Sequence, residues 1–254
     1  MFADANVKAL CVANWDTDGD GELSVAEAAA VTSLGEVFMG ANITSFDEFK
    51  YFTGITEIPD WHGFNDCTTL TSIVIPASVT SICGSAFANC VELRSLTVDP
   101  ENNVYDSRNN CNAVIETATN KLVVGCAVSQ IPYGITTIGD AAFWGRWWMQ
   151  KMIIPQTVTT IEGYAFAFCI SLNSIYLPAS VSAIGEGAFT ECGALTSVTV
   201  ERKIPVEIAE NVFTNRANAT LYVPAGYMAA YQVSDYWKEF KEAKIGRASC
   251  RERV

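Results

Sequence analysis

The sequence is poor in the residues that most often carry catalysis and anion binding. It contains one histidine, His62, and 16 basic residues against 28 acidic ones, a net charge of −12 at pH 7. A single imidazole excludes a multi-histidine metal site, and no serine or cysteine nucleophile is paired with it in a recognisable motif. The negative charge disfavours nucleic acid and anionic membrane surfaces as partners. Because no glycine-rich phosphate loop or glycosidase-like carboxylate pair occurs either, we predict that the chain is not an enzyme.

Long apolar runs are also missing. No stretch reaches the roughly 18 apolar residues of a membrane-spanning helix, and no signal-peptide core follows Met1, so we expect no membrane insertion. Hydrophobic residues make up 50% of the 254 positions, enough for one elongated domain or two ordinary ones. The C-terminal segment GRASCRERV, residues 246–254, resembles vector read-through and is treated as a non-native tail.

What the sequence does contain is a repeat. A phenylalanine recurs at intervals of 23 residues, with a final interval of 24, and is followed by shared apolar positions as in LTSIVIP. This spacing predicts a leucine-rich-repeat solenoid. Each coil would add one short strand to a parallel sheet on one face, with short helical or irregular segments on the other. The repeating residues are Phe64, Phe87, Phe143, Phe166, Phe189 and Phe213.

The copies IPASVTSICGSAFANC and LPASVSAIGEGAFTEC resemble the BspA-like leucine-rich repeats of surface proteins from gut and oral anaerobes. The similarity covers residues 41–245, and the N-terminal segment is similar to one that accompanies such repeats. The resemblance implies a bacterial protein that is secreted or attached to the cell surface, has no enzymatic activity and adheres to proteins or cells. We therefore divide the chain into an N-terminal cap, 1–40, and a repeat region, 41–245.

One interval of the repeat is too long. Phe87 and Phe143 are 56 residues apart, and the extra residues, near 104–126, contain CNAVIETATNKLVVGC. Apolar and charged residues pair symmetrically about the centre of this segment, which predicts a β-hairpin. The same register places Cys111 opposite Cys126, within reach of a disulfide after some adjustment. A secreted setting favours that disulfide, whereas a reducing habitat favours two free thiols.

Both ends of a solenoid leave an apolar coil face uncovered, so caps are expected. At the N-terminus, a predicted helix carries Val7, Leu10, Cys11 and Trp15 on one side. At the C-terminus, a final strand in ATLYVP precedes a predicted amphipathic helix in GYMAAYQVSDYWKEF.

The segment DTDGDGELSVAE, residues 16–27, matches an EF-hand calcium loop at every ligand position. Gly21 allows the sharp central turn, and Glu27 closes the loop as a bidentate ligand. Because the loop occurs once, we expect a structural Ca²⁺ that fixes the N-terminal cap rather than a paired calcium sensor. The alternative is a solvated acidic turn without metal. The expected ligands are Asp16, Asp18, Asp20, Glu22 through its backbone carbonyl, Ser24 and Glu27.

In four copies, a cysteine follows the phenylalanine by three positions. With no histidine among them, a row of small apolar side chains on the inner wall explains these cysteines better than a disulfide or a metal site. They are Cys67, Cys90, Cys169 and Cys192.

The segment AFWGRWWMQKM, residues 142–152, departs from the repeat. Arg146 takes the cysteine position, and Trp144, Trp147 and Trp148 take positions that other coils fill with small or polar residues. An exposed aromatic cluster flanked by Arg146 and Lys151 would suit a glycan or a protein hot spot. The alternative is that the tryptophans pack on the neighbouring hairpin.

The outward strand positions form two ladders of mostly small, neutral residues. Concave sheets of this kind are common binding surfaces, and an ordinary solvated sheet is the alternative. One ladder is Ser72, Ser95, Lys151, Ser174 and Ser197, and the other is Val74, Thr97, Ile153, Tyr176 and Thr199.

These features predict a non-enzymatic extracellular interaction or adhesion module that binds a protein or host-surface ligand. A glycan-binding accessory protein that uses the tryptophan cluster and a purely structural spacer are the alternatives.

Overall fold

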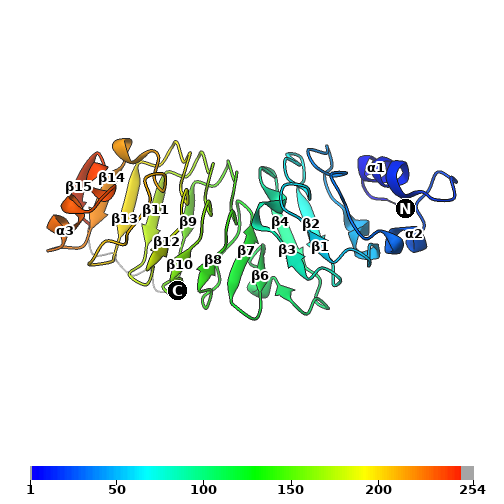
Figure 1. Cartoon of the computed structure of the whole chain (residues 1–254), viewed down its shortest axis with the longest axis horizontal. Helices are drawn as coiled ribbons and strands as arrows, with labels where there is room; N and C mark the ends of the chain where they lie inside the picture. The colour runs from blue at the N-terminus through cyan, green and yellow to red at the C-terminus, as the bar shows by residue number, and fades with distance from the viewer. Residues whose placement is uncertain (1, 247–254) are drawn as a thin grey trace.

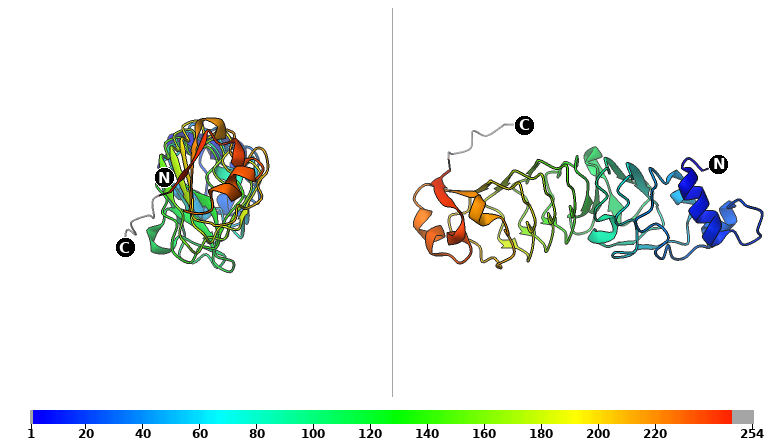
Figure 2. Two further views of the ribbon diagram at one scale, coloured as in Figure 1. Left: turned by 90° about the vertical axis from the view of Figure 1, so that its left-hand side faces the viewer. Right: turned by 90° about the horizontal axis from the view of Figure 1, so that it is seen from above.

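The computed structural model describes residues 2–246 and shows an elongated stack of coils (Figure 1). The N-terminal helices lie at one end of the stack, and the helix Met228–Val233 (α3) lies at the other (Figures 1 and 2). No helix within residues 2–246 is long and apolar enough to cross a membrane. Of the predicted non-native tail, only Gly246 belongs to the described residues.

One side of the stack consists of strands of three or four residues that pair in parallel. Ser174 pairs with Ser197 and Ile175 with Val198, so partners are one repeat apart. Alternate side chains are buried, because successive strand residues point to opposite faces. The predicted parallel ladder is thereby confirmed. It contains β2 (Ser72–Ile75) with β4 (Ser95–Val98), and then β9 (Lys151–Ile153), β11 (Ser174–Leu177), β13 (Ser197–Val200), β14 (Thr220–Val223) and β15 (Glu242–Ile245).

A second parallel row, which the sequence did not predict, runs along another side of the coils. Its strands are two residues long, too short to show a hydrophobic period, and each ends on a buried isoleucine. The row contains β1 (Glu57–Ile58) with β3 (Ser81–Ile82), and β8 (Thr137–Ile138), β10 (Thr160–Ile161) and β12 (Ala183–Ile184).

The extra residues of the long interval form an antiparallel meander. Its strands are β5 (Tyr105–Asp106), β6 (Ala113–Glu116) and β7 (Lys121–Gly125). The predicted β-hairpin is confirmed as β6 and β7. Strand β7 also pairs in parallel with β8, so the meander extends the second row into a six-stranded sheet of order β12-β10-β8-β7-β6-β5.

The expected alignment of Cys111 opposite Cys126 does not occur. A register shift within β6 pairs Ala113 with Gly125, one residue away from the symmetric register. A shift of one residue reverses the face on which a side chain lies, and the two thiols enter different clusters of the core. Both cysteines are buried and free.

The repeating phenylalanines form a column of buried, stacked rings. Successive ring centroids lie between 4.9 and 5.3 Å apart. The column begins earlier than predicted, because Phe38 stacks on Phe64 although the two are not one regular interval apart. Each coil therefore covers the apolar face of its neighbour. The members are Phe38, Phe64 and Phe87, then Phe143, Phe166, Phe189 and Phe213.

The column is interrupted in the meander coil, where Gly125 occupies the phenylalanine position. Its N–H donates to the carbonyl of Ala142, as the N–H of Phe143 donates to the carbonyl of Ala165 in the next coil. A Cβ at Gly125 would lie 2.1 Å from the Phe143 ring, so no larger residue fits. Here the buried residues divide into an N-terminal and a C-terminal cluster.

Helices and turns occupy the two ends. The helix α1 (Ala5–Trp15) is capped by Asp4 and buries Val7 and Cys11 in the N-terminal cluster; α2 (Val25–Ala30) follows the acidic loop. At the C-terminus, the expected helical segment contains α3 followed by a short 3-10 turn, and strand β15 comes after them. Short 3-10 turns occur at η1 (Asp47–Tyr51), η2 (Gly84–Phe87), η3 (Arg108–Asn110), η4 (Arg216–Asn218) and η5 (Trp237–Glu239).

Candidate functional sites

The loop between α1 and α2 brings three carboxylates together. One oxygen each from Asp16, Asp18 and Glu27 lies within 4.8 Å of the others. Gly19 and Gly21 adopt φ values of 77° and 82°, left-handed conformations that favour glycine and let the chain turn back on itself. The sequence pattern and the fold thus agree on the loop and on three of its acidic residues.

The remaining predicted ligands lie in different surroundings. Asp20 is not among the three converging carboxylates, and its Oδ1 accepts a hydrogen bond from the N–H of Glu22 at 2.8 Å. The side chain of Glu22 pairs with Lys8 Nζ, and the predicted ligand at this position is its backbone carbonyl. The Ser24 hydroxyl donates to Glu27 Oε2 at 2.9 Å.

Glu27 is held by hydrogen bonds on both carboxylate oxygens. The N–H and hydroxyl of Thr17 donate to Oε1, and the N–H and hydroxyl of Ser24 donate to Oε2. These bonds, led by the Ser24 N–H, lower the pKa of Glu27 to about 2. Ser24 and Glu27 also form the capping box that starts α2. The carboxylate is therefore ionised and oriented at neutral pH.

These residues fit Ca²⁺ chemically. Calcium prefers hard oxygen ligands, and Asp16, Asp18 and Glu27 supply carboxylates to one point. A cation among them would offset the repulsion between like charges held within 4.8 Å. To ligate through both oxygens, Glu27 would exchange some of its bonds from Thr17 and Ser24 for the ion.

The loop is joined to the first coils through Trp15, the residue immediately before Asp16. Its ring centroid lies 5.5 Å from that of Phe52 and 6.1 Å from that of Phe38, the first member of the phenylalanine column. A change in the conformation of the loop would therefore alter the packing of the Trp15 indole against the core.

The three tryptophans of the irregular segment lie in two settings. The ring of Trp144 packs against Tyr164 and Phe168 of the next coil, at centroid distances of 5.5 and 5.2 Å, and against Trp61 of an earlier coil at 5.2 Å. These contacts differ from the predicted packing on the hairpin. Trp147 and Trp148 remain 38% and 55% exposed. Phe168 could have been added to this cluster from the sequence alone, because other coils carry Asp, Asn, Gly or Glu at the same repeat position.

Arg146 does not flank this cluster at the surface, as the sequence suggested, but is fully buried. In regular coils the thiol at this position donates to the carbonyl of the preceding phenylalanine, as Cys169 does to Phe143 at 3.2 Å. Arg146 Nε makes the equivalent bond to Gly125 at 2.8 Å, and Nη1 continues to the carbonyl of Phe87 at 2.8 Å. The guanidinium is buried between the carbonyls of Gly125 and Phe87, which removes Arg146 from the candidate binding surface.

The ladder cysteines are buried, as predicted, and their thiols donate to main-chain carbonyls at 2.9 to 3.2 Å. Burial raises the pKa of Cys90 and Cys192 to about 12, so both remain protonated at neutral pH. They are structural hydrogen-bond donors on the inner wall.

The outward face of the five-stranded sheet carries an aligned row of side chains, which we call the sheet row. Ile153, Tyr176, Thr199, Tyr222 and Lys244 are register partners across β9, β11, β13, β14 and β15. Ile153 is 72% exposed, and an open hollow lies over Thr199, Tyr222 and Lys244. Lys151 is also exposed at the start of β9. Sequence reasoning identified Tyr176 but missed Tyr222, whose coil lacks the regular motif.

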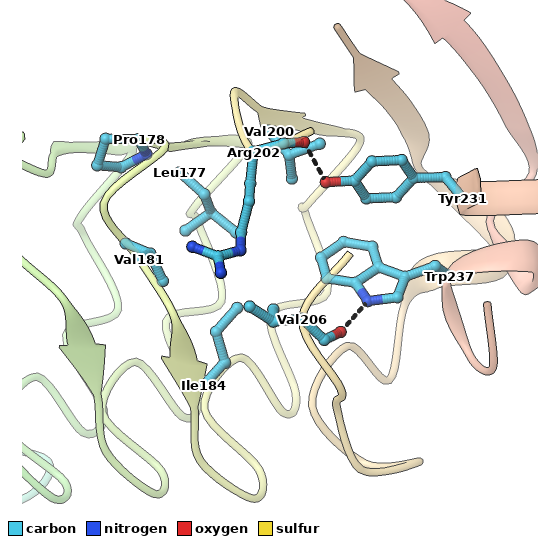
Figure 3. A pocket seen from close by; sticks show the side chains of 9 residues that line it. All are labelled: Leu177, Pro178, Val181, Ile184, Val200, Arg202, Val206, Tyr231 and Trp237. Carbon is cyan, nitrogen blue, oxygen red and sulfur yellow. Dashed lines mark hydrogen bonds between the residues drawn. The ribbon is translucent and has the colours of Figure 1, made fainter. Parts of the chain in front are cut away.

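A small apolar hollow lies between the last regular coil and α3 (Figure 3). The Arg202 side chain lies in it beside Leu177, while Tyr231 and Trp237 form the opposite wall. The Tyr231 hydroxyl donates to the Arg202 carbonyl at 2.7 Å, and the Trp237 indole donates to Val206 at 2.8 Å. Because Arg202 occupies the hollow, this feature seals the C-terminal end rather than offering a ligand site.

The stacked coils, the phenylalanine column and the parallel ladder define a leucine-rich-repeat protein. Residues 31–120 and 125–227 match the family model described as the BspA type leucine rich repeat region, in six copies. The match covers most of the 254 residues, so the chain belongs to the BspA-type leucine-rich-repeat family.

Solved structures share this fold. A leucine-rich repeat protein from Eubacterium ventriosum is 21% identical, with a TM-score of 0.62 over 83% of this chain and 56% of that one. A leucine rich cell surface protein from Faecalibacterium prausnitzii is 20% identical, with a TM-score of 0.56 over 81% of this chain and 60% of that one. This chain thus spans less than two thirds of either protein. No curated protein matches the chain significantly.

Proposed function

We propose that this chain is a non-enzymatic, extracellular interaction or adhesion module. Its leucine-rich-repeat solenoid would bind a protein or host-surface ligand, and its N-terminal cap would hold one structural Ca²⁺. The family and the name of the Faecalibacterium relative, a cell surface protein, support the setting. The observation that carries the binding function is the sheet row.

The sheet row has the features of a protein-binding face. Its members lie on five hydrogen-bonded strands, so their positions are fixed relative to one another before a partner arrives. An exposed isoleucine, two tyrosines and a lysine combine apolar contact with hydrogen bonding, and aromatic residues are enriched among the residues that dominate binding energy. A rigid, mixed surface of this kind suits a folded protein partner.

Surface plasmon resonance against immobilised extracellular matrix proteins tests the proposal. We expect at least one matrix protein to bind, and Tyr222→Ala with Ile153→Ala to weaken that binding at least about tenfold. Tyr133→Ala with Val128→Ala is the matched control, because both residues are exposed, at 83% and 43%, and lie away from the sheet. Absence of binding to the whole panel, or equal losses in the two double variants, would refute the role of the sheet row.

The calcium proposal rests on the three converging carboxylates and on the link through Trp15. A bound ion would hold the loop closed and keep α1 and α2 over the apolar face of the first coil. At a free calcium concentration of one hundred times the dissociation constant, the ion would add about 2.7 kcal/mol to the stability of the cap.

Calorimetric titration and thermal melts with and without EDTA test this step. We expect one bound Ca²⁺, a lower melting temperature of the N-terminal region on chelation, and a change in Trp15 fluorescence. Asp16→Asn should abolish all three effects, whereas Asp47→Asn, an exposed position outside the loop, should leave them intact. Identical melting curves in calcium and EDTA would refute a structural ion.

A further inference from the structure

A second surface departs from the repeat along one edge of the stack. Trp147, Trp148, Phe168 and Ile170 belong to two adjacent coils and are 38%, 55%, 37% and 46% exposed. Trp147 and Ile170 occupy the same repeat position one coil apart, and the Phe168 ring lies 5.2 Å from that of Trp144. We call these four exposed side chains the edge patch.

The core does not require these residues. At the position of Trp147, other coils carry Thr68 or Gly193, and at the position of Trp148 they carry Thr69 or Ala194. Those coils stack normally with small or polar residues there. Exposed aromatic side chains that packing does not demand are a recognised mark of binding sites.

The edge patch is already ordered. The Trp148 indole donates from Nε1 to Glu92 Oε1 at 3.1 Å, and Glu92 is in turn paired with Arg94 at 3.2 Å. The Phe168 ring packs against Trp144, which is itself packed against Tyr164 and Trp61. A ligand would meet rings whose orientation is largely set, which reduces the entropy lost on binding.

Size and charge indicate the kind of ligand. Aromatic side chains have roughly 150–250 Å² of surface, so the exposed fractions amount to about 400 Å². A stable protein interface needs about 800 Å² per partner, twice this area. Of the nearby charged groups, Glu92 is paired with Arg94, Lys151 is a single cation, and Glu191, at the repeat position of Phe168 in the next coil, is a single anion. Gln150 and Asn173 are exposed and follow Trp148 and Ile170 by two and three residues; their amides offer donors and acceptors, although Asn173 Oδ1 already accepts from the Ser174 hydroxyl at 3.0 Å.

We propose that the edge patch binds a neutral oligosaccharide. The C–H faces of sugar rings would stack on Trp147 and Trp148, and their hydroxyls would hydrogen-bond to the Gln150 and Asn173 amides and to Glu92. The net charge of −12 disfavours anionic glycans. This site is separate from the sheet row, and its binding does not depend on a protein partner.

Affinity electrophoresis in gels that contain neutral polysaccharides tests the proposal, with a β-glucan, a xylan, an α-mannan and a galactan as probes. We expect retardation by at least one of them. Trp148→Ala and Trp147→Ala should each weaken it at least about tenfold, as loss of a central aromatic anchor does elsewhere. Tyr133→Ala, at an 83% exposed tyrosine outside the patch, should migrate like the wild type.

Several outcomes would overturn the proposal. The first is that none of the four polysaccharides retards the protein. The second is that retardation is unchanged in both tryptophan variants, and the third is that Tyr133→Ala loses as much retardation as they do. Binding of the edge patch to a matrix protein instead, lost in Trp148→Ala, would identify a protein site. The double variant of Tyr222 and Ile153 should keep its polysaccharide binding, which separates this test from that of the sheet row.

Discussion

The regular coils of the C-terminal half and the coil that contains the meander place different residues at the same core positions. From Phe143 to Phe213, neighbouring ring planes are within 4° of parallel, and each thiol bonds to the carbonyl one coil back. In the meander coil, Gly125 replaces the ring, and in the coil that follows it, Arg146 replaces the thiol. Arg146 Nε donates to the Gly125 carbonyl, which joins the two coils.

The difference shows which features of the repeat are structural. The hydrogen bond to the preceding phenylalanine position is kept at Gly125 even though both side chains have changed. The guanidinium then reaches Phe87 and joins the N-terminal and C-terminal clusters. Its Nη2 is buried without a hydrogen-bond partner in residues 2–246, so this junction carries an unsatisfied donor on a buried cation, which costs more than the neutral Ser180 hydroxyl left unpaired in the regular coils. We therefore expect the regular stack to be the more stable region.

Loss of a ring from the regular column should have the largest effect. Phe166→Ala removes a fully buried ring stacked on both neighbours, and we expect a loss of about 3–5 kcal/mol in the free energy of unfolding. Urea denaturation measures it. Phe168→Ala, two residues away and partly exposed, should lose less than half as much. Equal losses would mean that the column does not carry the stability of these coils.

Arg146→Ala should weaken the junction by about 2–3 kcal/mol. The change leaves a cavity and removes bonds to the carbonyls of Gly125 and Phe87, although it also relieves the desolvation of a buried cation. Arg146→Met, which fills the space without the hydrogen bonds, should recover part of the loss. Arg94→Ala serves as the surface control, and a stabilised Arg146→Ala would show that the desolvation dominates.

Loss of a single ladder thiol should be milder. Cys169→Ala removes one buried hydrogen bond to Phe143 and a small apolar volume, which amounts to about 1 kcal/mol. Cys83→Ala, at a half-buried cysteine outside the ladder, should have less effect. The comparison is made by thermal melts of both variants. If Cys83→Ala were the more destabilising, the ladder would not be a stabilising row.

The smallest effect is expected from titration of the exposed Glu27. Because its pKa falls from 4.5 to about 2 on folding, the folded chain binds fewer protons than the unfolded chain. The resulting stabilisation is present above about pH 4.5 and is lost as the pH falls toward 2. In calcium-free buffer, the advantage of wild type over Glu27→Gln in the free energy of unfolding should shrink across this window. A constant difference would contradict the hydrogen-bonded arrangement of Glu27.

The sequence predicted those parts of the fold that follow the 23-residue repeat. The 23-residue spacing was sufficient for the parallel ladder and the phenylalanine column, and symmetric pairing was sufficient for the β6–β7 hairpin. Phe38 was missed because its interval to Phe64 is irregular, and the second row was missed because two residues show no period. A register shift in β6 undid the expected pairing of Cys111 with Cys126.

The candidate sites divide in the same way. A local motif was sufficient to place Asp16, Asp18 and Glu27 together, because the ligands of such a loop are close in sequence. The fate of Arg146 depended on Gly125 and Phe87, which are distant in sequence and meet only in the fold. The contact of Trp144 with Trp61 likewise bridges coils that the repeat does not place next to each other.

Native-state amide hydrogen exchange, compared between wild type and Arg146→Ala, tests most directly whether neighbouring coils stabilise one another through this junction. We expect faster exchange in β7 and in the turn around residues 141–146, with β11 and β13 unchanged. Uniform acceleration along the whole stack, or no change near β7, would contradict the role assigned to Arg146 and Gly125.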